Sequence, residues 1–226
     1  MAQHDRLSVL NSIFDIGIVP VFYHKNPETT IRIIECCAEG GARCVEFTNR
    51  GDMAYHVFTD AISHVLNNNI DVILGIGSIC DAPTAALYIA NGANFVVGPL
   101  LNEEVARLCN RRKIAYSPGC GSVSEIGKAE ELGVEIVKVF PGTEVGGPAF
   151  VKSVLGPCPW TRIMPTGGVD ATKESLASWI NSGVAAVGAG SKLITKDLVD
   201  AKDWDGLTKK IAQSVKWVKE IREDMK

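Results

Sequence analysis

Eight short apolar runs, rich in β-branched residues, recur along the 226-residue chain and constrain its fold more than any other feature. They occupy residues 16–23, 44–48, 72–76, 95–97, 114–116, 136–140, 162–164 and 185–187. Helix-like stretches lie between them, among others at residues 27–39, 54–67, 102–112 and 172–180. Alternating strands and helices are typical of parallel α/β proteins, and continuous apolar strands indicate burial on both faces.

The number of these strand–helix units favours a closed barrel over an open sheet. Eight units close a (β/α)8 TIM barrel, whereas an open doubly wound sheet normally uses about five or six strands and gathers its glycines after the first one. The first strand of this chain runs instead into Tyr23-His24. We therefore predict an α/β fold, a single (β/α)8 barrel domain over residues 1–226. An extra N-terminal helix (6–14) is expected to cover its floor, and a last helix is expected at 204–222.

Composition narrows the classes of partner and location. Hydrophobic residues make up 46% of the chain and the formal net charge is -3, so there is no basic excess for binding nucleic acid. No run of about 18 apolar residues and no secretory signal pattern is present. We expect a cytoplasmic protein without a membrane partner.

Cysteines and histidines do not form a metal-binding pattern. The seven cysteines include no CxxC motif, and their odd number indicates reduced thiols. His24, His56 and His64 lack the spacing of metal ligands relative to carboxylates. The sequence predicts no metal and no organic cofactor.

Lys138 is the most informative residue at the predicted strand ends, where barrel enzymes carry their reactive groups. It lies between Val137 and Val139 in an apolar strand, so its side chain is expected in a dry environment. Loss of hydration lowers the pKa of an amine and makes its neutral, nucleophilic form accessible. The alternative is a structural lysine that reaches water or pairs with a carboxylate.

Glu46 and Arg50 add two further charged groups at the end of the second strand. Glu46 stands between Val45 and Phe47, again in an apolar strand. It is either the ion-pair partner of the lysine or a group that moves protons during a reaction. Arg50 is either a two-pronged ligand for a substrate carboxylate or an exposed loop residue.

Two glycine-rich segments follow the last two strands. Gly167-Gly168 and Gly188-Ala189-Gly190-Ser191 stand where many barrels bind phosphate with backbone N–H groups. Tight turns would explain either segment alone. Together they indicate a phosphate pocket, to which the Ser191 hydroxyl adds a donor.

The chain resembles the 2-keto-3-deoxy-6-phosphogluconate (KDPG) and 4-hydroxy-2-oxoglutarate (KHG) aldolases over nearly its whole length. Seven motifs, taken in order, carry this resemblance. They are Ile18-Val19-Pro20-Val21, Val45-Glu46-Phe47-Thr48-Asn49-Arg50, Gly75-Ile76-Gly77-Ser78, Pro118-Gly119 with Ser124-Glu125, Lys138-Val139-Phe140-Pro141, Pro165-Thr166-Gly167-Gly168 and Gly190-Ser191.

The resemblance implies a role for each residue that matches the family pattern. Lys138 would form a Schiff base with the C2 carbonyl, Glu46 would act as general acid/base through a water, and Arg50 would hold the keto-acid carboxylate. Ser78 replaces the usual threonine and would contact pyruvate, and Phe140 would pack beside the keto acid. The implied phosphate pocket consists of Thr166, Gly167, Gly168, Gly190 and Ser191.

The implied reaction is reversible cleavage of KDPG to pyruvate and glyceraldehyde 3-phosphate, and of KHG to pyruvate and glyoxylate, by a homotrimer. His24, Lys25, Leu100 and Cys120 depart from the usual pattern on the side that would face the aldehyde portion. An aldolase for the galactonate epimer or for an unphosphorylated keto acid therefore stays open. So do a phosphate-binding barrel of other chemistry and a silent barrel that only binds a sugar phosphate.

Overall fold

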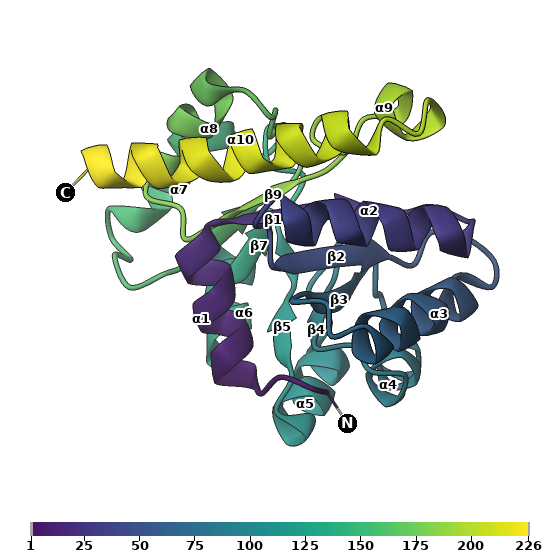
Figure 1. The fold of residues 1–226 in the computed structure, drawn as a ribbon. Helices are drawn as coiled ribbons and strands as arrows, with labels where there is room; N and C mark the ends of the chain where they lie inside the picture. The colour runs from purple at the N-terminus through teal and green to yellow at the C-terminus, as the bar shows by residue number, and fades with distance from the viewer. Residues whose placement is uncertain (1, 226) are drawn as a thin grey trace.

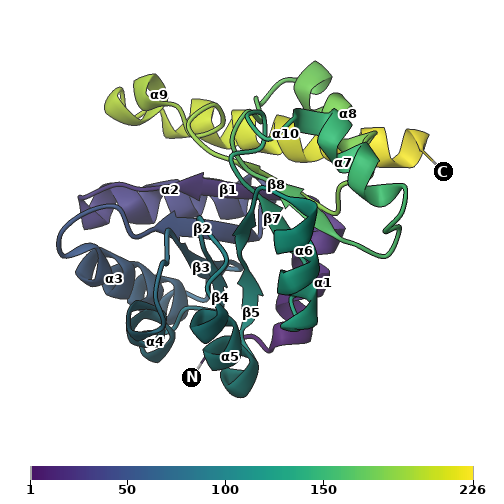
Figure 2. The same cartoon turned by 180° about the vertical axis from the view of Figure 1, so that it is seen from behind.

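The computed structural model of the chain describes residues 2–225 and folds into a ring of parallel strands inside a shell of helices (Figures 1 and 2). The strands are β1 (Ile18–Phe22), β2 (Cys44–Thr48), β3 (Ile73–Gly77), β4 (Phe95–Val97), β5 (Ala115–Ser117), β6 (Gly119–Cys120), β7 (Val137–Val139), β8 (Ile163–Pro165) and β9 (Val187–Ala189). All except β6 fall on or within about two residues of a predicted apolar run, as is usual for element boundaries.

The pairing of the strands closes the ring. One sheet has the order β5-β4-β3-β2-β1-β9 and another the order β6-β7-β8, and all their pairs are parallel. β5 corresponds to the predicted fifth strand (114–116), and β6 is a short additional strand beyond Pro118, which has no N–H to donate. A bridge between Thr166 and Gly188 links β8 to β9. The predicted eight-stranded barrel is confirmed.

Helices surround this ring, and their ends follow from local sequence. They are α1 (Arg6–Ile16), α2 (Pro27–Glu39), α3 (Ala54–Asn67), α4 (Ala82–Ala90), α5 (Glu103–Arg112), α6 (Val123–Glu131), α7 (Gly147–Leu155), α8 (Lys173–Ile180), α9 (Lys196–Asp200) and α10 (Trp204–Asp224). The side chains of Asn26 and Asp81 accept N–H bonds at the starts of α2 and α4. None of the helices described has the combination of length and hydropathy that a membrane span needs.

The extra helix α1 covers the barrel floor, as predicted. It runs two residues further than the predicted 6–14 and ends at Gly17, whose φ of 74° is the left-handed conformation that stops a helix. Val9 and Ile13 on α1 pack against interior residues such as Val19 and Cys44. In Figure 1, α1 lies at one end of the strands and α9 at the other, so the open mouth lies on the side of α9.

Two apolar layers hold the fold together. The outer layer lies between strands and helices and includes Val45, Phe47, Val137 and Val139. The inner layer fills the lower barrel and ends below the mouth. Because successive strand residues point to opposite sides, the residues between outer-layer positions point into the barrel.

Candidate active site

Lys138 and Glu46 point into the upper barrel, where the inner apolar layer ends. Both neighbours of Lys138, Val137 and Val139, belong to the outer layer, and so do Val45 and Phe47 on either side of Glu46. Strand alternation therefore turns the two charged side chains inward. The structure thus places both side chains on the inner side of the barrel, Glu46 from β2 and Lys138 from β7.

Glu46 is a buried carboxylate without a hydrogen-bond partner. Its side chain is 1% exposed, and neither Oε1 nor Oε2 has a partner in the described chain. Burial raises the pKa of Glu46, while the positive charges of Lys138 and Arg50 act in the opposite direction. The group can therefore hold a proton more readily than an exposed glutamate, which suits acid/base chemistry.

A glycine on the neighbouring strand makes the space for this carboxylate. A Cβ atom on Gly77 would lie 1.8 Å from Glu46 Oε1, so any larger residue there would force the carboxylate to move. Gly77 lies in the Gly75-Ile76-Gly77-Ser78 motif, but the motif alone does not indicate this packing role. Its signal was a glycine in a buried strand, which often marks a close approach of another group.

Lys138 is held among apolar and aromatic groups. It is 5% exposed, and its Nζ lies 4.9 Å from the centre of the Phe140 ring. Burial lowers the pKa of Lys138, the carboxylate of Glu46 opposes that effect, and Arg50 adds to it. No carboxylate oxygen lies within the 4.0 Å ion-pair distance of Lys138 among residues 2–225. The neutral amine is therefore accessible for nucleophilic attack.

Arg50 and Ser78 meet at the rim beyond β2 and β3. Arg50 Nε donates a hydrogen bond of 3.3 Å to Ser78 Oγ, and the exposed guanidinium keeps its remaining donors for an anion. Ser78 has a φ of 61°, in the left-handed region that non-glycine residues rarely adopt. Such strain is common at ligand sites, and here it sets the direction of the Ser78 hydroxyl.

The glycine loops after β8 and β9 lie side by side at the opposite part of the rim. Gly167 and Gly168 both have positive φ, and the backbone N–H groups of Gly167, Gly168, Gly190 and Ser191 make no backbone hydrogen bond in the described chain. The Thr166 hydroxyl is buried without a partner. Unpaired N–H groups and a hydroxyl on two adjacent segments are suited to an anion such as phosphate.

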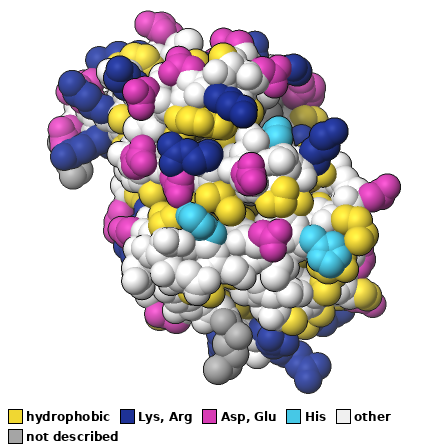
Figure 3. Space-filling view, turned by 45° about the vertical axis from the view of Figure 1, so that its right-hand side comes forward, with side chains coloured by type: hydrophobic (Ala, Val, Ile, Leu, Met, Phe, Trp, Pro, Cys, Tyr) yellow, Lys and Arg dark blue, Asp and Glu magenta, His cyan; other side chains and the backbone are white. Residues whose placement is uncertain are grey.

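Metal ligands, the Cys120 thiol and the surface charge are further features that could serve a function. No group of three or more His, Cys, Asp or Glu residues that could hold a metal occurs in the described part of the chain. Cys120, which the sequence placed near the pocket, belongs to the outer apolar layer, and burial raises the pKa of its thiol to about 12. On the face shown in Figure 3, acidic, basic and histidine side chains are interspersed with hydrophobic ones.

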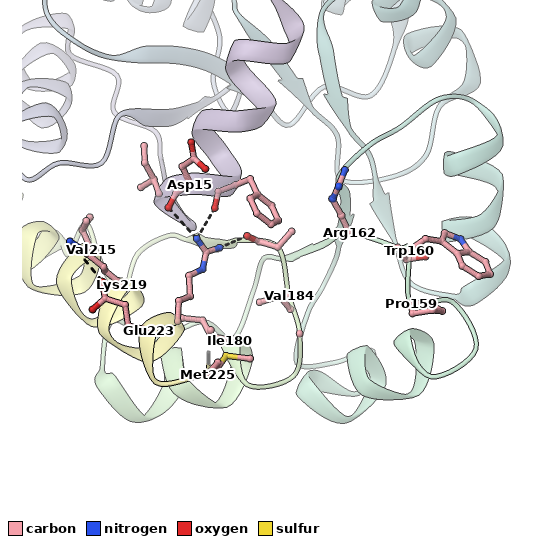
Figure 4. Close-up of a pocket in the computed structure, with 16 residues that line it drawn as sticks. Asp15, Pro159, Trp160, Arg162, Ile180, Val184, Val215, Lys219, Glu223 and Met225 are labelled. Carbon is pink, nitrogen blue, oxygen red and sulfur yellow. Dashed lines mark hydrogen bonds and ion pairs between the residues drawn. The ribbon is translucent and has the colours of Figure 1, made fainter.

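A pocket of about 890 Å³ lies at the opposite end of the barrel from the mouth, between the α1–β1 corner and α10 (Figure 4). There Arg222 donates hydrogen bonds to the carbonyl oxygens of Phe14 at 2.6 Å and Asp15 at 3.1 Å. These bonds tie the last helix to the floor. Because that end of a barrel generally serves stability, we assign it no catalytic role.

A family model, two curated relatives and a solved structure that are similar to this chain all belong to the same family. A model of the KDPG and KHG aldolases matches residues 9–210. The 2-dehydro-3-deoxy-phosphogluconate aldolase of Haemophilus influenzae is 28% identical over 93% of this chain and 97% of its own length. That of Pseudomonas aeruginosa is 33% identical over 83% and 82%. The crystal structure of the KDPG aldolase from Legionella pneumophila, with pyruvate captured as a covalent carbinolamine, has a TM-score of 0.81 at 24% identity and covers 93% of this chain and 98% of that one.

Proposed function

Because the chain belongs to the KDPG and KHG aldolase family, we propose that it is a class I aldolase whose Lys138 amine forms a Schiff base with a 2-keto acid. The observation that carries this proposal is the joint burial of Lys138 and Glu46 in the upper barrel. Desolvation shifts the pKa of the amine down and that of the carboxylate up, which suits a nucleophile and a proton carrier.

The reaction begins with attack of the neutral Nζ on C2 of the keto acid. Loss of water from the resulting carbinolamine gives a protonated imine, which serves as an electron sink. The C3–C4 bond then breaks as the C4 hydroxyl gives its proton to Glu46 through a water, and the bonding electrons form an enamine. The aldehyde leaves, C3 takes up a proton, and hydrolysis returns pyruvate and the free amine.

The remaining site residues position the two ends of the substrate. Arg50 and Ser78 hold the carboxylate, and Phe140, whose ring lies against Lys138 Nζ, packs beside the keto acid. Thr166, Gly167, Gly168, Gly190 and Ser191 bind the phosphate through unpaired N–H groups and hydroxyls. No metal or organic cofactor takes part in these steps.

The substrate follows from this arrangement of a carboxylate site and a phosphate site on one rim. KDPG has both groups and yields pyruvate and glyceraldehyde 3-phosphate, which agrees with the names of the relatives. KHG, which yields pyruvate and glyoxylate, is a second substrate, as the name of the KHG/KDPG aldolase of Escherichia coli suggests. The galactonate epimer and unphosphorylated keto acids are the alternative substrates.

The proposal extends to the state of the protein in the cell. We propose one domain over residues 1–226, a homotrimer and a cytoplasmic location. The homotrimer rests on the family resemblance, and its test is the molar mass of the purified protein by light scattering. A monomer would contradict it.

Reductive trapping tests the imine chemistry directly. Incubation with pyruvate and borohydride should add one pyruvate-derived mass to the intact protein, and peptide mapping should place it on Lys138. An unchanged mass would reject the Schiff-base mechanism and favour a phosphate-binding barrel of other chemistry. Steady-state rates on 2-keto-3-deoxy sugar acids, with and without the terminal phosphate and as both C4 epimers, then identify the preferred substrate.

A further inference from the structure

The order of strands around the barrel places the end of β1 between the two proposed anion sites. β1 pairs with β9 on one side and with β2 on the other. Phosphate is assigned to the loops after β8 and β9, and the carboxylate to the rim after β2 and β3. Residues that follow β1 therefore face the middle of a substrate that spans these sites.

The register of β1 points more closely to one carbon. Val21 of β1 pairs with Glu46 of β2, so the residues just beyond Val21 stand above that carboxylate. In the proposed reaction, Glu46 receives the proton of the C4 hydroxyl. The C4 oxygen is therefore the substrate atom nearest to the end of β1.

A pocket of about 450 Å³ opens at this place and contacts one residue of each proposed anion site. Arg50 lines it from the side of β2 and Ser191 from the side of β9, and between them stand Tyr23 and His24. Its remaining lining residues are mostly apolar, together with the ion-paired Lys196 and Asp200 of α9. The pocket thus shares Arg50 and Ser191 with the proposed substrate site and has few free polar groups.

His24 supplies a hydrogen-bond donor in this pocket. Its Nδ1 lies 3.2 Å from the backbone N of Asn26 and 3.4 Å from the carbonyl oxygen of Asn26. We assign the shorter contact as the hydrogen bond, in which Nδ1 accepts the Asn26 N–H and the neutral ring carries its proton on Nε2. The carbonyl oxygen of His24 accepts the Thr30 hydroxyl at 3.0 Å, which fixes the backbone. Nε2 has no hydrogen-bond partner among residues 2–225. The adjacent Lys25 is exposed and does not line the pocket.

We propose that His24 is a specificity-determining residue, whose Nε2–H donates a hydrogen bond to the C4 oxygen of the keto acid. This inference rests on the proposed function and deepens it. The C4 oxygen becomes the carbonyl oxygen of the released aldehyde, so the same donor polarises that carbonyl in the synthetic direction. An inverted C4 centre would turn its oxygen away and leave the Nε2–H without a partner.

The test compares wild-type protein with His24→Leu, which keeps a side chain of roughly similar size but removes the donor. Cleavage of KDPG should lose about tenfold to a hundredfold in kcat/KM, and the preference between the C4 epimers should fall by a similar factor. Pyruvate contains no C4, so its borohydride trapping at Lys138 should stay within about twofold of wild type. His24→Gln, which restores an N–H donor, should recover part of the loss.

Lys25→Leu is the matched control on the same loop and should behave as wild type. Cleavage and epimer preference that stay within about threefold of wild type in His24→Leu would overturn the proposal. A parallel loss of pyruvate trapping would also overturn it, because the effect would then not be confined to C4. Failure of wild-type protein to trap pyruvate would instead reject the proposed aldolase function.

Discussion

Charged side chains such as Arg6 are paired at the floor of this barrel, whereas the two buried charged side chains at its mouth are unpaired. At the floor, Arg6 donates to Asn110 Oδ1 and to Glu135 Oε2, each at 2.7 Å, and Asp5 caps α1. At the mouth, Glu46 and Lys138 are buried without an ion pair between them. Paired charges add to stability or cost little, whereas unpaired buried charges cost stability. The mouth thus gives up stability for reactivity, and the floor does not.

The largest expected effect is that of Lys138→Met, which removes the nucleophile at the mouth. Turnover should fall on the order of 10⁵-fold, as when other covalent nucleophiles are removed, and pyruvate trapping should disappear. The thermal midpoint should stay the same or rise, because a buried amine is replaced by an apolar chain of similar length. Unfolding of Lys138→Met would show instead that the lysine belongs to a structural ion pair.

Glu46→Gln should have the next largest effect, since it removes proton transfer but keeps the shape. We expect kcat to fall by about 10²- to 10⁴-fold, the range typical of general acid/base groups. Adduct formation with pyruvate should be slower, yet Lys138 should still be the labelled residue. Single-turnover kinetics with KDPG measure the loss, and kcat within about threefold of wild type would remove Glu46 from the mechanism.

Ile13→Ala tests the floor of the barrel, where we expect an effect on stability and none on activity. Ile13 is 4% exposed in the inner layer at the floor, so its truncation should cost about 2–5 kcal/mol in the free energy of unfolding. Activity measured well below the thermal midpoint should be unchanged. Denaturant unfolding gives the stability. A loss of kcat in the folded protein would show that the floor and mouth are coupled.

The elements of the fold could be predicted from the sequence more closely than the contacts at the mouth. Apolar strand patterns and helix caps are local signals, so the barrel and α1 could be predicted closely. The predicted fifth strand (114–116) stops before Pro118, so the sequence does not predict β6 or the side to which Cys120 points. Only the structure shows that Cys120 faces outward while Lys138, on the adjacent strand, faces in.

The sequence pattern did not predict the contacts between residues on different strands and loops. Arg50 and Ser78 were each assigned to the keto acid by resemblance, but their hydrogen bond depends on the relative position of β2 and β3. The fit of Glu46 against Gly77 depends on packing across the same two strands. His24 was recognised as a departure together with Lys25, and only the pocket lining separates them. Such distinctions need three-dimensional packing, which one sequence does not encode locally.

The smallest expected effect is a difference in how the two ends respond to pH. Burial raises the pKa of Glu46, so the folded state holds that proton more tightly than the unfolded chain. Wild type should therefore lose stability relative to Glu46→Gln as pH rises above the ordinary glutamate value of 4.5. At the floor, hydrogen bonds from Ser8 lower the pKa of Asp5. Wild type should accordingly gain stability relative to Asp5→Asn as pH rises, and lose it as pH falls below the ordinary aspartate value of 3.8.

Thermal midpoints of the three proteins across this range measure the two slopes, whose signs should be opposite. Each slope compares one variant with wild type, so costs of the substitutions that do not depend on pH cancel. The Asp5 effect should be the weaker, because Asp5 is exposed to solvent and salt. Slopes of the same sign would mean that Glu46 is stabilised in its charged form on folding. The mouth would then resemble the floor, and the buried carboxylate would be half of an ion pair rather than a proton carrier.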